Sequence, residues 1–332
     1  MYYFSPSFEG FGMLVYILFV VGFVLLIKGA DILVDGATSI GKKLNVSSLV
    51  IGLTIVSFGT SLPELLVNLV SSYNDAPDIG VGNILGSNIA NILLILGIAA
   101  LINPLPITKN TYFIEIPFSL TATLLVGFLA NASLFGTKGV DFVISQYDGG
   151  ILLFFFVLFM GYVYIVSKQR KSEFADSDYK EMSTSKSVLL IVAGMVGLYF
   201  GGQWVVDGAV LMATELGMSE RFIGLTIIAV GTSLPELVTS AVAAFKNDTD
   251  IAVGNVVGSN IFNLLWILGL SSALKPIPYD VISNSDVFMI IASSTALILA
   301  VVVGKRPVIS RWEGFFFLIA YFWYITFLIQ RG

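Results

Sequence analysis

Residues Ile51 to Glu64 read IGLTIVSFGTSLPE, and residues Ile223 to Glu236, 172 positions later, read IGLTIIAVGTSLPE. The same offset relates 81–91 (VGNILGSNIAN) to 253–263 (VGNVVGSNIFN). Over the 51 positions from 51 to 101, 27 residues are identical in the two copies. The chain therefore contains an internal repeat, and the copies align without a gap.

The composition indicates a membrane protein. Hydrophobic residues make up 56% of the chain and charged residues 12%, whereas about 25% of an ordinary soluble domain is charged. There is no cysteine and no histidine, which excludes disulfides, thiolate or imidazole metal ligands and the usual catalytic base. A metal ion bound here must therefore be a hard cation held by oxygen atoms.

Ten apolar segments are long enough to cross the hydrocarbon core as helices, which takes roughly 20 residues. We expect them at about 12–36, 46–73, 79–102, 112–132, 149–167, 187–212, 220–245, 251–273, 285–304 and 313–330. The polar stretch 169–186 is the predicted linker between two five-span repeats, residues 1–168 and 187–332. The predicted fold class is an all-α integral membrane protein, multi-pass in the plasma or inner membrane.

The basic residues predict the orientation. If the linker is cytoplasmic, twelve of the 17 Lys and Arg residues lie on that side, in agreement with the positive-inside rule. Both termini are then extracellular or periplasmic. Because each repeat has an odd number of spans, the copies enter the membrane from opposite sides and form an inverted-topology repeat. The second and seventh spans should meet near the midplane and bring Glu64 and Glu236 together.

Each copy places a proline and a carboxylate inside an apolar helix. Pro63 and Pro235 lack an N–H and crowd the carbonyl four residues back, so we expect both helices to be broken there. Carbonyls released near Ser57 and Ala229 are tolerated in a bilayer only if something satisfies them, and a cation would do so. A kink that serves packing alone is the alternative, but it does not explain why a carboxylate follows twice.

Hydroxyl and amide side chains recur at helical spacing around the two glutamates. They are Thr60, Ser61, Asn83, Ser87 and Asn91 in the first copy and Thr232, Ser233, Asn255, Ser259 and Asn263 in the second. Oxygen ligands of flexible number suit Ca²⁺, and two carboxylates neutralise one divalent ion. An empty site would leave the carboxylates repelling each other, so Ca²⁺ should leave only when Na⁺ or H⁺ replaces it. The asparagines could instead serve only as hydrogen bonds between helices.

The doubled motif Gly-Thr-Ser-Leu-Pro-Glu, followed by Gly-Asn…Gly-Ser-Asn, closely resembles the alpha-repeats of the Ca²⁺/cation antiporter superfamily, specifically its prokaryotic sodium/calcium exchangers. The resemblance covers both halves and implies alternating access, with Na⁺ entry driving Ca²⁺ export. It implies that Glu64 and Glu236 are the central ligands of both ions, and that the threonines and serines named above add oxygens. It also implies that the carbonyls of Ser57 and Ala229 line outer Na⁺ positions.

One position separates branches of the superfamily that the chain resembles. Asn263 stands where K⁺-coupled relatives carry Asp, so the resemblance implies exchange independent of K⁺. The implied protein is a transporter and not an enzyme, with no cofactor and with Ca²⁺ and Na⁺ as the transported ions. We expect a monomer in the lipid bilayer, with no nucleic acid as partner.

Three other functions are compatible with parts of the sequence. The two glutamates could carry protons, which would give an H⁺/Ca²⁺ antiporter of the same superfamily. Ser61 or Ser233 could be the nucleophile of an intramembrane hydrolase, but no base lies near either motif. A passive Ca²⁺ channel is the third, and inverted repeats with broken helices favour alternating access over it.

Two of the acidic residues that lie in predicted spans outside the motifs can be given an expected environment. Asp31 follows Lys28 by three positions, which predicts an ion pair within the first helix. Glu115 lies near the start of the fourth span, where we expect an interfacial position.

Overall fold

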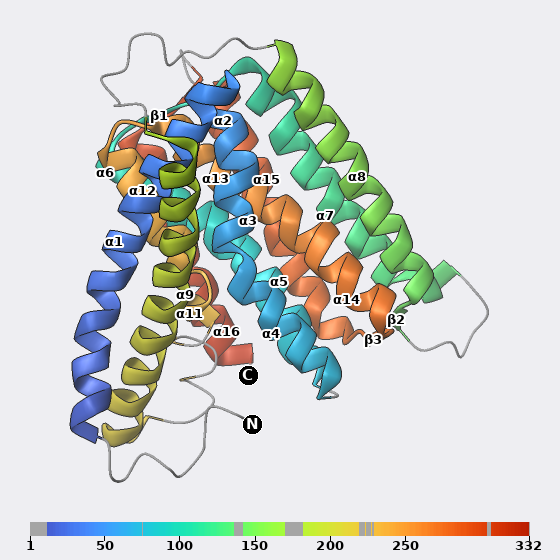
Figure 1. Cartoon of the computed structure of the whole chain (residues 1–332). Helices are drawn as coiled ribbons and strands as arrows, with labels where there is room; N and C mark the ends of the chain where they lie inside the picture. The colour runs from blue at the N-terminus through green and yellow to red at the C-terminus, as the bar shows by residue number, and fades with distance from the viewer. Residues whose placement is uncertain are drawn as a thin grey trace.

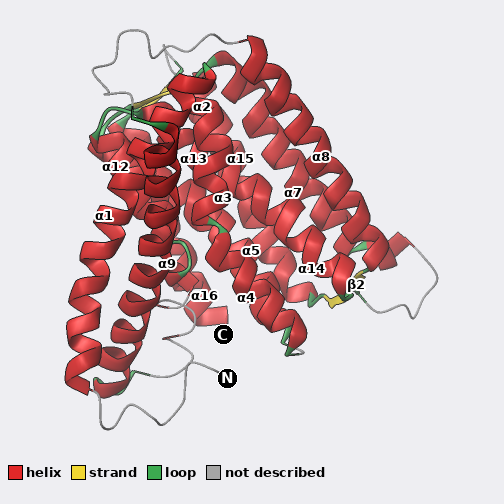
Figure 2. Ribbon diagram, in the orientation of Figure 1, coloured by secondary structure: helices red, strands yellow, loops and turns green. Residues whose placement is uncertain are grey.

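The computed structural model describes residues 12–74, 76–135, 142–169, 182–218, 223, 227, 229–303 and 307–331. Figure 2 shows that this part of the chain is almost entirely helical, with two very short strand pairs. The first half contains α1 Gly12–Leu44, α2 Ser48–Ile51, η2 Gly52–Val56, α3 Ser57–Thr60, α4 Leu62–Tyr73, α5 Pro77–Ala90, η3 Asn91–Ile95, α6 Leu96–Ile102, β1 Leu105–Pro106, η4 Thr111–Glu115, α7 Ile116–Ala130, η5 Ala132–Phe135, β2 Val143–Ile144 and α8 Gln146–Gln169. The second half contains α9 Thr184–Glu215, α11 Ala229–Gly231, α12 Leu234–Phe245, α13 Thr249–Ile261, η8 Phe262–Ile267, α14 Leu268–Leu274, β3 Ile277–Pro278, η9 Val281–Ser283, α15 Asn284–Val303, β4 Val308–Ile309 and α16 Arg311–Arg331.

Eight described helices, some built from consecutive elements, are long and apolar enough to cross a membrane. A ninth span is the predicted second one, whose two pieces, Ser48–Thr60 and Leu62–Tyr73, are bent by 44° at the proline motif. The predicted seventh span lies partly outside the described residues; from Ala229 onward it consists of α11 and α12, separated at Thr232 and Ser233. The predicted fold class, with its broken second and seventh helices, is confirmed.

The helices extend beyond the apolar segments that predicted them. α1 continues to Leu44 because Lys42 and Lys43 suit the negative end of a helix. Asn45 then adopts a left-handed conformation with φ of 56°, and Gly217, the equivalent position after α9, has φ of 73°. This conformation ends a helix by turning its backbone away, so both copies end their first long helix in the same way.

α1 and α9 lie side by side at one edge of the molecule, opposite α7 and α8 (Figure 1). Glycine makes their close approach possible. A Cβ atom on Gly29 would lie 3.0 Å from the carbonyl oxygen of Gly194, and one on Gly194 would lie 2.7 Å from that of Gly29. The two backbones therefore touch directly, as small residues allow in membrane helices.

Two strand pairs join the halves at opposite ends of the bundle. β1 pairs antiparallel with β4, and β2 pairs antiparallel with β3. We call the end at which α8 finishes and α9 begins the linker side; it is uppermost in Figure 1 and carries β1. β2 and β3 lie on the opposite side (Figure 1). Each pair connects a loop of one repeat to a loop of the other.

The expected ion pair of Asp31 with Lys28 is wrong. Asp31 does not pair within its helix but with Lys246, at 2.5 Å, because the end of α12 passes close to α1. Glu115 is fully buried among the helices, and Tyr162 of α8 donates a 2.5 Å hydrogen bond to its Oε1. Neither partner could be found from spacing along one helix.

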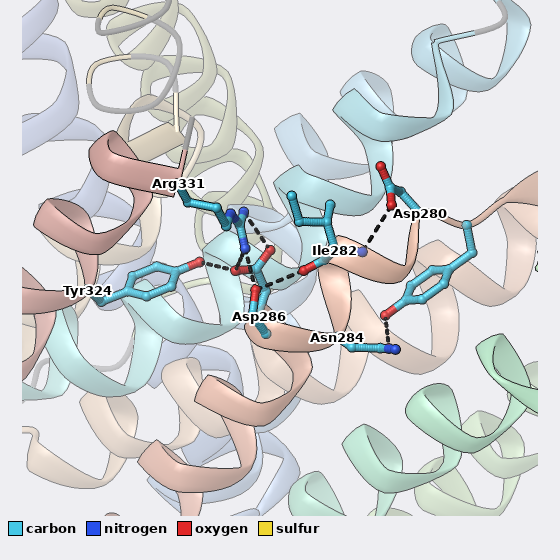
Figure 3. A network of polar contacts seen from close by, with 8 residues as sticks. Asp280, Ile282, Asn284, Asp286, Tyr324 and Arg331 are labelled. Carbon is cyan, nitrogen blue, oxygen red and sulfur yellow. Dashed lines mark hydrogen bonds and ion pairs between the residues drawn. The ribbon is translucent and has the colours of Figure 1, made fainter.

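An ion pair on the opposite side ties α16 to α15 (Figure 3). Nη1 of Arg331 lies 2.8 Å from Oδ1 of Asp286, and Nη2 lies 3.1 Å from Oδ2. Tyr324 donates a further 3.0 Å hydrogen bond to the same carboxylate. Asp286 is only 5% exposed, so this arrangement supplies both the opposite charge and the hydrogen bonds that a buried carboxylate needs.

Candidate cation-binding site

The two repeat glutamates begin the second pieces of the broken helices. Glu64 lies in the first turn of α4 and Glu236 in the first turn of α12, each directly after a proline. Both side chains are buried, at 0% and 1% exposed. A carboxylate is favourable at a helix N-terminus, since unpaired backbone N–H groups there carry partial positive charge.

The glutamates from the two halves lie close together. Ser61, three residues before Glu64, donates a 2.9 Å hydrogen bond to Oε1 of Glu236. The two carboxylates are near enough to repel each other when both are charged. Oε2 of each glutamate has no hydrogen-bond partner among the described residues. Two buried carboxylate oxygens without donors are the expected signature of a place that a cation occupies.

Hydrogen bonds cross between the halves at the threonines. Thr60 donates to Oδ1 of Asn255 at 3.1 Å, and Thr232 donates to Oδ1 of Asn83 at 2.9 Å. Each broken helix is therefore bonded to the partner helix of the other repeat. The hydroxyl oxygens retain lone pairs that can face a cation, because each hydroxyl here uses its proton as donor.

The asparagines make a hydrogen bond between helices and also leave amide atoms without partners among the described residues. Asn91 donates to Asn260 at 2.9 Å, which is a bond between helices, while its own Oδ1 has no partner among the described residues. Asn263 is 1% exposed, and neither its oxygen nor its nitrogen has a partner in that set. Both residues lie in wide π-helical turns, η3 and η8, which occur frequently at functional sites.

The remaining predicted residues lie around the same centre. Ser233 donates to Ser87 at 3.1 Å, and Ser87 donates a long 3.4 Å hydrogen bond to Oε1 of Glu64. Ser259 is buried beside Glu236, although no hydrogen bond of ordinary geometry joins them.

The backbone carbonyls of Ser57 and Ala229 were predicted to line outer Na⁺ positions. The carbonyl of Ser57 accepts a 3.0 Å hydrogen bond from the N–H of Ser61 and a long 3.4 Å one from the hydroxyl of Thr60, so an ion would have to replace the Thr60 hydroxyl there. The hydroxyl of Ser57 donates to the carbonyl of Asn255 at 2.9 Å. Ala229 begins α11, and its side chain lies outside the described residues.

Asn68 and Ser240 extend the site and were not predicted. Asn68 donates to the carbonyl of Glu64 at 3.1 Å, and Asn255 donates to the carbonyl of Glu236 at 3.3 Å and to Ser240 at 2.9 Å. Asn68 and Ser240 occupy equivalent positions, one turn after each glutamate, and that spacing could have identified both.

Comparison with known proteins agrees with this geometry. A family model described as sodium/calcium exchanger protein matches residues 14–165 and 186–330, which is most of the chain. The chain belongs to the sodium/calcium exchanger family. The protein is therefore a multi-pass membrane antiporter of cations including Ca²⁺; it is not an enzyme and needs no cofactor.

Several exchanger relatives match over nearly their whole length. The putative antiporter CaxA of Alkalimonas amylolytica is 40% identical, over 94% of this chain and 98% of that protein. The sodium/calcium exchanger MaX1 of Methanosarcina acetivorans is 33% identical, over 95% of this chain and 97% of that protein. A solved structure of the sodium-calcium exchanger NCX_Mj, soaked with Na⁺ and Sr²⁺, has a TM-score of 0.77 and 35% identity, covering 95% of this chain and 98% of that one.

Proposed function

We propose that this protein exports Ca²⁺ in exchange for Na⁺ by alternating access, with Glu64 and Glu236 as the shared ligands of both ions. One observation carries the proposal: two buried carboxylates from opposite repeats lie together, and each keeps one oxygen without a hydrogen-bond partner among the described residues. Two negative charges match one Ca²⁺ or two Na⁺. Exchange is obligatory because vacating the pocket would leave the charges uncompensated in a low dielectric.

Neutral oxygens complete the proposed ligand set. Within the described residues, no group of three or more acidic side chains could hold a metal ion, so most of the six to eight ligands that Ca²⁺ takes must be uncharged. We assign these ligands to the hydroxyls, amides and carbonyls around the glutamates. They are Thr60, Thr232, Ser61, Ser233, Ser87, Ser259, Asn91, Asn263, Ser57 and Ala229.

Na⁺ is the coupling ion that we favour over H⁺. Two relatives with near-complete coverage, MaX1 and NCX_Mj, are sodium/calcium exchangers at 33% and 35% identity. The test uses proteoliposomes loaded with Na⁺ and diluted into Na⁺-free buffer with ⁴⁵Ca²⁺. We expect Ca²⁺ uptake that an imposed pH gradient cannot replace; uptake driven by the pH gradient alone would instead establish H⁺/Ca²⁺ exchange.

We further propose that exchange does not require K⁺. Asn263 is neutral, so among the described residues the fixed negative charge of the site comes from two glutamates, without a third charge to balance an additional K⁺. Uptake should be the same with K⁺ or with choline as the accompanying cation. Coupled movement of ⁸⁶Rb⁺ would contradict this.

The predicted orientation completes the proposal. The linker side carries most of the basic residues, so we place it in the cytoplasm and both termini outside, in the cell membrane. Each chain contains both glutamates, so a monomer provides a complete site. Labelling of single cysteines placed in the linker and at the C-terminus with an impermeant reagent would test the orientation.

A further inference from the structure

Lys246 connects two helices at the linker side. It follows α12 directly, and its Nζ lies 2.5 Å from Oδ1 of Asp31 and 2.7 Å from Oδ1 of Asp35, both on α1. The ammonium group also donates to the carbonyl of Asp31 at 3.2 Å. One side chain thus joins α1 to the end of the helix that carries Glu236.

The other repeat does not reproduce this connection. The offset of the repeat relates Lys246 to Asn74, and relates Asp31 and Asp35 to Gln203 and Asp207, as the sequence shows. Gln203 instead donates a 3.0 Å hydrogen bond to Asp207 within α9. The two copies therefore differ in charge at the end of the broken helix, although their binding motifs are nearly identical.

The connection is ionic and only partly screened by water. The side chain of Lys246 is 21% exposed, and those of Asp31 and Asp35 are 36% and 37% exposed. Partial burial opposes the charge of Lys246, but the hydrogen bonds and charges of the two aspartates outweigh it and raise the pKa of the ammonium group. Lys246 therefore stays charged at neutral pH.

The linker side of the site is also the more closed one. Thr60 and Asn255 are fully buried, whereas their counterparts Thr232 and Asn83 are partly exposed. Near the linker side, Asn103 donates to Oδ1 of Asn247 at 3.0 Å and to the carbonyl of Ala244 at 3.3 Å.

The opposite side contains a cavity in the equivalent region. Its volume is about 230 Å³, and it lies between the end of α4, the start of α5 and the loop that contains β3. Asn68, which is bonded to the carbonyl of Glu64, lines it. The structure is thus tight on the side that carries Lys246 and more open on the other side, where no ion pair among the described residues joins the end of α4 to α9.

We propose that Lys246, Asp31 and Asp35 form an ionic latch, which holds the linker side closed and must open before an ion can enter or leave there. Because the other repeat has no equivalent, the latch favours the state in which the site is open to the opposite side. The latch is a positioning device and does not touch the transported ions. It rests on the proposed alternating-access function.

The chain has no cysteine, so a single introduced thiol reports access without background. Ser240 is suitable because it is buried, bonded to Asn255, and lies on the linker side of Glu236. The experiment follows labelling of the Ser240→Cys protein by an impermeant methanethiosulfonate from the linker side, without Na⁺ or Ca²⁺. Adding Lys246→Gln should speed labelling roughly fivefold, the effect of losing two partly exposed ion pairs.

Matched variants distinguish the loss of the latch from a general loss of stability of the helix bundle. Lys186→Gln removes an exposed charge from the same side and should leave labelling unchanged. The double variant Asp31→Lys with Lys246→Asp should restore slow labelling, because it exchanges the charges and keeps an ion pair. Unchanged labelling in Lys246→Gln, equal acceleration by Lys186→Gln, or failure of the charge exchange to restore slow labelling would each overturn the proposal.

Labelling needs no transport, so this test and the Na⁺-gradient test fail independently. Faster labelling of Lys246→Gln supports the latch even if Na⁺ does not drive Ca²⁺ uptake. If Na⁺ drives Ca²⁺ uptake but Lys246→Gln leaves labelling unaltered, the latch is rejected and the proposed function is retained.

Discussion

Ser61 donates a 2.9 Å hydrogen bond to Glu236, although the two residues belong to different repeats. The equivalent Ser233 does not bind Glu64 directly but donates to Ser87, which in turn donates to Glu64 at 3.4 Å. Two nearly identical motifs therefore hold their carboxylates in different ways. The pocket is asymmetric at the level of single hydrogen bonds.

Ser61→Ala should weaken Ca²⁺ binding more than Ser233→Ala. A hydrogen bond to a charged group contributes about 1.5–3 kcal/mol, so we expect a loss of about tenfold or more for Ser61→Ala. For Ser233→Ala the loss should be smaller, because Ser87 still contacts Glu64. Equilibrium ⁴⁵Ca²⁺ binding to the purified protein measures both, and the reverse order would contradict a direct role of Ser61.

Glu64→Gln and Glu236→Gln should each reduce exchange by about a hundredfold or more, because one uncompensated charge in a buried pair costs several kcal/mol. Both variants should still elute as single symmetric peaks in detergent, since glutamine preserves the size of the side chain. Glu313→Gln, on the first turn of α16, is the matched control and should exchange normally. Ca²⁺ transport at the native rate by either site variant would contradict the assignment of that glutamate as an ion ligand.

Gly258→Ala should destabilise the bundle. A Cβ atom there would lie 2.2 Å from Oγ of Ser57 and 2.9 Å from Cα of Leu53, so α13 and η2 would have to separate. Overpacking of this kind costs about 1–3 kcal/mol. Gly161→Ala, at an exposed position of α8, should be tolerated, since a Cβ atom there meets no described residue within 4 Å. Size-exclusion chromatography after heating measures how much folded protein remains in each variant. Equal losses of folded protein in both would show that the contact of Gly258 with η2 and Ser57 does not limit stability.

Arg331→Gln should lower stability by roughly 3 kcal/mol, because it leaves Asp286 buried without its cation. The double variant Asp286→Asn with Arg331→Gln should recover much of that loss, since it removes the charge as well. Thermal denaturation of the two variants in the same detergent gives the comparison. A double variant no more stable than the single one would indicate that charge compensation is not what matters.

The positions of the spans and the pairing of Glu64 with Glu236 could be predicted because both follow from strong local constraints. Apolar length predicts a membrane helix, and an odd number of spans per repeat requires that the copies be inverted. A carboxylate next to a proline in each copy then places both acids in the broken turns. All of this information lies within a few residues of each motif.

Contacts between distant helices could not be predicted in the same way. Asp31 had a basic neighbour at helical spacing, yet its partner is Lys246, more than 200 positions away. The burial of Glu115 and its bond to Tyr162 could not be predicted either, because they depend on how the fourth span packs against α8. The different bonds of Ser61 and Ser233 are likewise invisible in two identical motifs, because they depend on how the repeats meet.

The hydrogen bonds from Thr60 to Asn255 and from Asn91 to Asn260 have a consequence for biosynthesis. When the ribosome has completed only the first five spans, Thr60 and Asn91 are already in the lipid, and their partners have not been translated. Such groups are costly in hydrocarbon until they are paired. The first repeat must therefore use other partners until the second is inserted, and the carbonyl of Ser57, 3.4 Å from the Thr60 hydroxyl, is one such acceptor.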